Sequence, residues 1–398
     1  MVIRKGIIER FYEAASIQRW NDHVRPVELT ELGKQAHKMV IAYVLGRLEE
    51  SRGTKINWIY LIEGGLFEFL HRVILTDIKP PVFHQMMRQK GKELNEWVLS
   101  ELDRDISDIK GGFKTKFQQY FCGEETADYH LERRILKAAH YLATKWEFRI
   151  IYNMSPYLYG IEKTRAEIED EIEDYYDLIG VQQLLLDKKI YGFIDLCGQL
   201  RFQQRWAQSP RIPKTSVLDH MLIVALLSYL CSLEINACDT RFYNNYFAGL
   251  FHDLPEVLTR DIVSPIKSSV VGLQDLIKEY EEIQIRERIL PLLPETWHEE
   301  IHYFVEDEFA NKIKMDGRVV KGIAEMEMAH YNENKYAALD GHILKACDHL
   351  AAFIEATLSI DQGIKSHHLE EGQNRLYQMY RNKTVGGINF GQLFDYFR

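Results

Sequence analysis

Four residues on apolar segments are of types that could hold a metal ion together. They are His220 in LDHMLIVALLSYL, the adjacent His252 and Asp253 in YFAGLFHDLPEVLTRD, and Asp348 in ILKACDHLAAFIEATL. Two imidazoles and two carboxylates suit a borderline divalent ion, and an octahedral ion would keep two open positions for a water and a substrate oxygen. The set therefore points to metal-assisted hydrolysis.

Each of these residues also has an ordinary structural interpretation. A lone histidine in an apolar helix, such as His220, is more often a core residue, and an adjacent His-Asp pair is weak evidence by itself. Asp348 is the most informative, because a carboxylate buried among alanines and leucines needs a cation. Neighbours on a helix point about 100° apart, so His252 and Asp253 can meet one ion only over a helix end.

The elements that must position these residues are helices. Apolar residues recur at three- and four-residue spacing in segments such as HKMVIAYVLGRLEE and LDHMLIVALLSYLCSLE, and strand-type alternation is almost absent. We therefore expect an all-α fold. The charged run TRAEIEDEIEDYYD fits a solvated helix face better than an acidic metal site.

Length, composition and net charge argue against several classes of protein. A chain of 398 residues has room for two domains, and its net charge of −10 argues against a general binder of nucleic acid or anionic membranes. A small anionic substrate held by local cations stays possible. The five scattered cysteines include no CxxC pair, which indicates reduced cytosolic thiols. With no secretory leader and no apolar run long enough for a bilayer, we expect a soluble cytoplasmic protein.

The two halves of the chain contain similar segments in the same order. SIQRWNDHVRPVELTELGKQAHKMVIAYVL resembles FQQRWAQSPRIPKTSVLDHMLIVALLSYL, LFEFLHRVILTDIKPPV resembles LFHDLPEVLTRDIVSPI, and RILKAAHYLA resembles HILKACDHLA. Amphipathic helices can be similar by chance, but the shared Arg-Trp and Asp-x-x-x-Pro elements favour a duplication. We predict two domains, 1–186 and 187–398.

The two copies differ where the candidate chemistry lies. The first copy has His37 for His220, Glu68-Phe69 for His252-Asp253, and His140 for Asp348. Phenylalanine cannot bind a metal ion, so the first copy should lack a comparable site. We interpret it as a degenerate, structural repeat.

The pattern H…HD…D resembles the HD-domain phosphohydrolases. With HDLPEVLTRDIVSPIK at the pair and Arg-Trp ahead of the first histidine, it is most similar to the bacterial HD-domain 5′-deoxyribonucleotidases. The resemblance covers roughly residues 190–398, and the first half only as a decayed copy. It implies two tandem HD-domain-like helical bundles. Because the family enzymes pair as homodimers, it also implies that the two copies form an intrachain pseudo-dimer, with a further homodimer left open.

The resemblance implies that His220, His252, Asp253 and Asp348 bind one divalent transition metal ion: Co, Mn, Ni, Zn or Fe. It implies that Glu256, in HDxxE, orients or deprotonates the nucleophilic water. A histidine at this position would instead suggest the di-iron oxygenase branch.

The resemblance also implies a set of substrate contacts. Asp261 would donate a proton to the leaving sugar oxygen or bind its hydroxyl, although a helix N-cap is an equal alternative. Arg205 and Lys267 would bind the phosphate, where surface cations are the alternative, and Trp206 would line the sugar or base pocket unless it is a core residue.

Two positions depart from the family pattern. Arg260 stands where the family usually has glycine, in EVLTGD, which adds bulk and charge beside the expected pocket. Asp219 replaces the usual glutamate before the first histidine.

The leading hypothesis is an enzyme, a metal-dependent phosphoric monoester hydrolase that acts on nucleotides. The expected substrate is a 2′-deoxyribonucleoside 5′-monophosphate. A phosphodiesterase or a nucleoside-triphosphate hydrolase would use the same site. A non-catalytic nucleotide sensor or scaffold is the remaining alternative.

Overall fold

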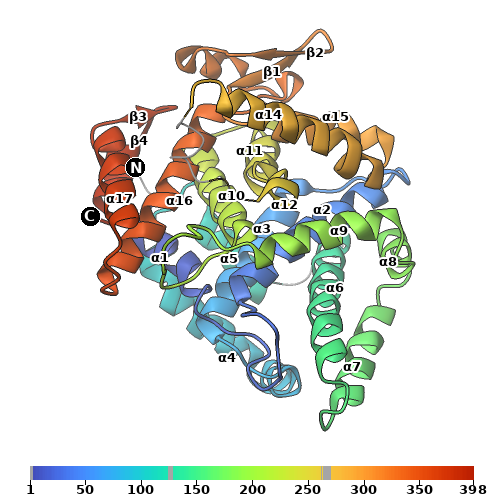
Figure 1. The fold of residues 1–398 in the computed structure, drawn as a ribbon. Helices are drawn as coiled ribbons and strands as arrows, with labels where there is room; N and C mark the ends of the chain where they lie inside the picture. Colours follow the sequence, from blue (N-terminus) through green and yellow to red (C-terminus); the bar gives the residue numbers. More distant parts are fainter. Residues whose placement is uncertain (1–2, 124–128, 261, 263–269) are drawn as a thin grey trace. The chain divides into compact units, whose positions relative to one another are not determined.

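The computed structural model describes residues 3–123, 129–260, 262 and 270–398. Two predicted site residues, Asp261 and Lys267, lie outside this range. The regular secondary structure of the described chain is almost entirely helical, with two small two-stranded sheets (Figure 1), which confirms the all-α prediction.

The chain divides into two compact units. We call Gly6–Asp195 the N-terminal unit, and Leu196–Arg398 together with residues 1–5 the C-terminal unit. The domains 1–186 and 187–398, and the pseudo-dimer, stay predictions.

The N-terminal unit is built around a long buried helix, α2, which packs against α6, α3 and α8. Its helices are α1 (Lys5–Glu13), α2 (Glu31–Glu50), α3 (Trp58–Leu75), α4 (Pro80–Ile106), α5 (Phe113–Cys122), α6 (His130–Met154), α7 (Ile161–Glu173), α8 (Ile179–Leu185) and the start of α9 (Lys189–Gln199). Helix α4 is kinked at Lys90, whose backbone is not helical.

The C-terminal unit is built around α10 (Val217–Glu234), which packs against α11 (Asp239–Phe251) and α16 (Gly341–Asp361). The other helices are α12 (Glu256–Thr259), α14 (Leu273–Gln284), α15 (Glu295–Val305), α17 (His367–Tyr380) and α18 (Phe390–Asp395). Short 3-10 or π turns are η2 (Leu200–Phe202), η3 (Ile285–Ile289), η4 (Leu290–Leu292), η5 (Glu325–Tyr331) and η6 (Asn334–Tyr336).

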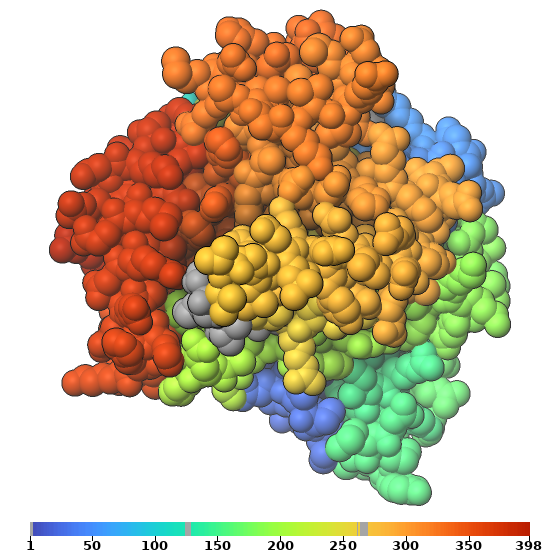
Figure 2. All heavy atoms as spheres, turned by 45° about the horizontal axis from the view of Figure 1, so that its top comes forward, coloured from blue at the N-terminus to red at the C-terminus, as the bar shows by residue number. Residues whose placement is uncertain are grey.

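Two antiparallel hairpins complete this unit. Strands β1 (Lys312–Met315) and β2 (Arg318–Lys321) form one, and β3 (Thr384–Val385) and β4 (Ile388–Asn389) form the other. Figure 2 shows the first hairpin and α14 at the surface, and α14 has no buried residue.

Helix α10 is long and apolar enough to cross a membrane by length and composition, contrary to our expectation that no segment reaches that length. Within the structure 94% of it is buried. A helix that is apolar on all sides is expected at the centre of a bundle, which is where α10 lies.

The two units begin their central helices in the same way. An isolated β-bridge joins Gln18 to Thr30 in the N-terminal unit and Gln204 to Ser216 in the C-terminal unit. Thr30 is the N-cap of α2 and Ser216 the N-cap of α10, and each side-chain oxygen accepts from a backbone N–H three residues later. These shared features support the predicted duplication.

The tryptophans of the two Arg-Trp elements also match. Trp20 and Trp206 both have a left-handed backbone, with φ of 54° and 55°. Each indole N–H donates to a buried glutamate, Trp20 to Glu147 at 2.7 Å and Trp206 to Glu355 at 3.1 Å. Left-handed backbone is uncommon outside glycine, so its recurrence at one position is a specific similarity.

The N-caps of α2 and α10 correct the predicted match between His37 and His220. His220 lies four residues after the N-cap Ser216, and the residue four after Thr30 is Lys34, so the match of His37 with His220 is wrong by about one helical turn. His37 instead donates to the carbonyl of Ile194 at 3.0 Å.

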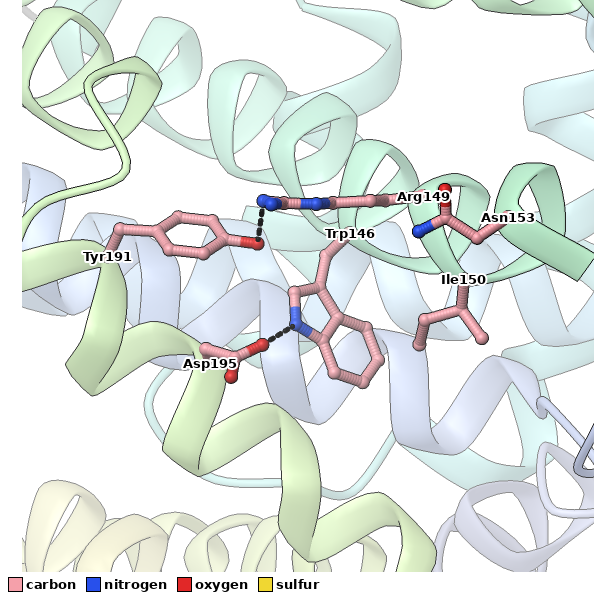
Figure 3. A pocket seen from close by; sticks show the side chains of 6 residues that line it. All are labelled: Trp146, Arg149, Ile150, Asn153, Tyr191 and Asp195. Atoms are coloured by element: carbon pink, nitrogen blue, oxygen red, sulfur yellow. Dashed lines mark hydrogen bonds between the residues drawn. The ribbon is translucent and has the colours of Figure 1, made fainter.

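The His37 ring packs edge-on against Trp146, with 4.9 Å between ring centroids. Trp146 lines a pocket of about 270 Å³ in the N-terminal unit (Figure 3). The other lining residues are Arg149, Ile150, Asn153, Tyr191 and Asp195. His37 therefore belongs to the packing beside this pocket.

Candidate metal centre

His220 lies in the first turns of α10 and is completely buried. Its Nε2 is 2.8 Å from Oδ1 of Asp348, and its Nδ1 is 3.3 Å from Oε1 of Glu355. A proton on Nδ1 can donate to Glu355, which leaves the Nε2 lone pair for a metal ion beside Asp348. This is the carboxylate–histidine arrangement that orients metal-binding imidazoles.

His252 caps the C-terminal end of α11, and Asp253 follows outside the helix. The Nδ1 of His252 donates to the carbonyl of Gly249 at 2.8 Å, so the neutral ring carries its proton on Nδ1 and has the Nε2 lone pair for a metal ion. The buried Nε2 has no hydrogen-bond partner in the described part of the chain, although Oδ2 of Asp253 is 3.2 Å away. The adjacent pair thus meets at a helix end, as two neighbours must if they share one ion.

Three of the four predicted ligands form one group. Donor atoms of His220, His252 and Asp348 all lie within 4.8 Å of one another. Asp253 is outside this group but contacts it through His252. A buried acceptor nitrogen with no hydrogen-bond partner, two imidazoles and carboxylate oxygens fit a divalent ion of the kind that accepts both N and O ligands.

The ionisable side chains of the group have shifted pKa values. Burial disfavours a charged imidazole, but the carboxylates of Asp253 and Asp348 outweigh it and raise the pKa of His252 to about 9. Burial raises the pKa of the Asp348 carboxyl, and the hydrogen bond and charge of His220 outweigh this and lower it well below its usual range. The site therefore stabilises positive charge next to its carboxylates, as a cation site must.

Glu355 is the functional candidate that sequence reasoning missed. It lies two turns after Asp348 on α16 and is almost completely buried. Besides His220, it accepts from Thr215 at 3.1 Å and from Arg211 at 3.3 Å. Burial raises its pKa, but the charges of Arg211 and His220 outweigh it and keep the carboxyl ionised. The only sequence signal is its seven-residue spacing from Asp348, which places both on one helix face.

The Arg-Trp element lies in the segment before α10. The Arg205 side chain is 14% exposed, with one terminal guanidinium nitrogen 3.9 Å from Oδ2 of Asp253 and Nε 4.0 Å from Oε2 of Glu355. Its guanidinium is thus at the edge of the candidate metal group. The indole N–H of Trp206 donates to Glu355, so this side chain also supports the group from outside.

A comparison with protein families matches residues 197–377 to the HD domain. Residues 197–377 form an HD domain. All the candidate metal ligands and Glu355 fall within it.

The chain is also similar to curated proteins named 5′-deoxynucleotidase. The relative from Vibrio atlanticus is 24% identical over 198 residues, which is 48% of this chain and 86% of the relative. The relative from Photobacterium profundum is 28% identical over 201 residues, with the same coverage of 48% and 86%. The relative from Pasteurella multocida is 22% identical over 182 residues, or 44% of this chain and 77% of the relative. No solved structure gives a significant match.

Glu256 begins the short helix α12 of the HD domain, one turn beyond His252, and is buried. Its backbone N–H donates to the carbonyl of Asp253 at 3.0 Å. This bond holds the backbone of Glu256 next to the pair, and its role in orienting water stays a prediction. Asp261 and Lys267 lie outside the described residues, so their roles stay predictions.

Arg260 stands where the resemblance to the family leads us to expect glycine. Its φ of 64° and ψ of 162° fall in a backbone region that is essentially restricted to glycine. The non-glycine residue here costs about 1–3 kcal/mol of backbone strain.

Asp219, before the first histidine of the HD domain, completes a capping box. Its Oδ2 accepts the backbone N–H of Ser216 at 2.7 Å, and the Ser216 hydroxyl accepts the N–H of Asp219 at 3.1 Å. Burial raises the pKa of Asp219 to about 6. The acidic residue thus fixes the start of α10, and with it the position of His220.

Proposed function

We propose that the chain is a metal-dependent phosphohydrolase that releases phosphate from 2′-deoxyribonucleoside 5′-monophosphates. The observation that carries the proposal is the group of two buried histidines, His220 and His252, with the partly buried Asp348 inside an HD domain. The substrate class is suggested by the similarity to proteins named 5′-deoxynucleotidase.

The residues present fit a divalent metal ion, held by His220, His252, Asp253 and Asp348. A divalent ion bound there would lower the pKa of a coordinated water and withdraw charge from the phosphoryl group. We propose that this ion is Co, Mn, Ni, Zn or Fe, and loading the protein with each in turn identifies the one that supports turnover.

The protein side chains would do the rest of the work. Glu256, fixed at the start of α12, would orient the attacking water or accept its proton. Arg205 at the edge of the group would bind the phosphate oxygens by a bidentate contact, and Lys267 would add a second cation. Asp261 would return a proton to the leaving sugar oxygen. Trp206, whose N–H is used by Glu355, would offer only its ring to the nucleoside.

A nucleotide panel tests this function. Full-length protein loaded separately with each of the five metals should release orthophosphate from at least one deoxynucleoside monophosphate. Chromatography would distinguish orthophosphate from pyrophosphate or triphosphate, and so separate this reaction from the triphosphate and diester hydrolases. Asp348→Asn should abolish turnover, while Asp361→Asn, an exposed aspartate at the end of the same helix, should not. No turnover by metal-loaded protein on any nucleotide would reject the proposal.

A further inference from the structure

The N-terminal unit has a buried lysine where the C-terminal unit has its first metal-ligand histidine. Lys34 is four residues after the N-cap of α2, as His220 is after the N-cap of α10. Its Nζ lies 2.9 Å from each ring nitrogen of His140, as Nε2 of His220 lies 2.8 Å from Asp348. A cationic side chain thus occupies the ligand position.

Two of the three neighbouring positions lose negative charge or gain positive charge, and the third, Glu68 in place of His252, is paired with Lys38. Counting from Glu68, which the repeat pairs with His252, Phe69 replaces Asp253 and Arg72 replaces Glu256. The register is supported by Thr76, whose φ of 59° and ψ of −159° match the strained backbone found at Arg260. Acidic groups that would attract a cation have therefore been lost, and two cationic groups gained.

The carboxylates that remain are already used by other cations. Glu31 accepts from Arg19 at 2.9 Å, Glu147 accepts from Arg19 at 3.0 Å, and Glu68 pairs with Lys38 at 2.5 Å. These pairs leave Lys34 and Arg72 as the cations with the weakest acceptors.

Both of these cations have hydrogen-bond donors without good acceptors. Among the described residues, the ammonium of Lys34 has His140 as its only hydrogen-bond partner, although it carries three N–H donors. The buried Nε of Arg72 has no hydrogen-bond partner in the described chain and is 3.9 Å from Oε2 of Glu31. One of its terminal nitrogens donates to Oδ1 of Asp77 and to the carbonyl of Ile78, both at 3.4 Å. Buried donors without acceptors are costly, so the cluster needs an acceptor from outside.

The pKa shifts disfavour the protonated forms of Lys34 and His140, through burial first and then through neighbouring cations. Burial and then the charge of Arg19 lower the pKa of Lys34, although Glu31 and Glu147 partly oppose this. Burial, and then Lys34 and Lys38, lower the pKa of His140. A bound anion would relieve this repulsion.

The cluster is open to the same degree as the candidate metal group. The side chains of Glu68 and Arg72 are 25% and 19% exposed, and those of Asp253 and Asp348 are 20% and 18% exposed. Lys34 is buried, as His220 is, and both groups have partly exposed side chains at their edges.

We propose that Lys34, Arg72 and His140 bind a phosphate group in the N-terminal unit without hydrolysing it. A phosphate supplies several acceptor oxygens around one centre, which matches the donors left on Lys34 and Arg72. The cluster lacks the metal ligands of the C-terminal unit, so it has no means of activating a water in the same way. The phosphate can be free or carried by a nucleotide. This proposal does not rest on the proposed hydrolase function.

Equilibrium dialysis of labelled inorganic phosphate against the full-length, metal-stripped chain tests the proposal. Removing the metal weakens binding of phosphate at the C-terminal site, and the comparison with Lys34→Met assigns the remaining binding to the N-terminal unit. We expect about one phosphate per chain in the wild type and at least tenfold weaker binding in Lys34→Met. Lys116→Met removes an exposed lysine of the same unit, paired with Glu63, and should bind like the wild type.

Competition distinguishes the two sources of phosphate. Displacement of the label by dAMP at lower concentration than by phosphate indicates a nucleotide site, and weaker displacement indicates a site for the free ion. If Lys34→Met does not fold, Arg72→Gln, at a partly exposed position, gives the same comparison. No phosphate bound by the wild type, or equal binding by the wild type and the folded variant, would overturn the proposal.

Discussion

Glu355 offers a test of whether the candidate metal group depends on a carboxylate behind its first histidine. Glu355→Gln keeps the size of the side chain but removes the charge that accepts from Nδ1 of His220 at 3.3 Å. Loss of such an outer carboxylate typically weakens metal binding by about 10- to 100-fold, or about 1.4–2.7 kcal/mol. Chelator competition with the full-length chain measures this change directly.

The structure supplies a matched control for this variant. Glu147 in the N-terminal unit accepts from Arg19 and Trp20, much as Glu355 accepts from Arg211 and Trp206, but it orients no metal ligand. Glu147→Gln should therefore lower stability without changing metal affinity.

Two variants of Glu355 separate its role in orienting His220 from its contribution to packing. Glu355→Ala removes the partner of Arg211, whose side chain is 1% exposed, and should destabilise the C-terminal unit by about 3–5 kcal/mol. Glu355→Gln should lose metal affinity while keeping most of that stability, since an amide oxygen can still accept from Arg211. Wild-type metal affinity in Glu355→Gln would refute the reasoning.

Two further predictions concern the stability of the C-terminal unit. Arg260→Gly should raise the free energy of unfolding by about 1 kcal/mol in urea titrations. Glycine relieves the backbone strain at φ 64°, and the greater conformational entropy of the unfolded glycine variant offsets part of this gain. Lower stability of the variant would contradict this. Burial lowers the pKa of Lys312 from 10.5 to about 8, so between pH 8 and 10.5 the unfolded chain binds more protons than the folded chain. The free energy of unfolding should therefore rise with pH across this window by up to about 3 kcal/mol relative to Lys312→Met, and a parallel pH dependence of the two proteins would count against it.

The helical class and the candidate ligands could be predicted because both depend on local patterns. Three- and four-residue spacing of apolar residues leads directly to helices, and a carboxylate such as Asp348 stands out in an apolar helix. The closeness of His220, His252 and Asp348 depends on how α10, α11 and α16 pack, which the spacing does not reveal.

Two features escaped sequence reasoning for physical reasons. Apolar helices match one another almost equally well after a shift of one turn, so the sequence alone pairs His37 with His220, whereas the N-caps place Lys34 at that position. Glu355 resembles any charged residue on an amphipathic helix, and only its contact with His220 marks it. The resemblance to glycine-containing sequences flagged Arg260, but its backbone conformation gives the cause.

The number of metal ions per chain tests the central claim most directly. Elemental analysis of the full-length protein after equilibration with a divalent metal and removal of excess should give one equivalent, because only the C-terminal unit keeps the His and Asp group in the described chain. His220→Ala and Asp348→Asn should each reduce this to nearly none, while Asp361→Asn keeps one equivalent. Two equivalents in the wild type, or an unchanged equivalent in His220→Ala, would contradict the account.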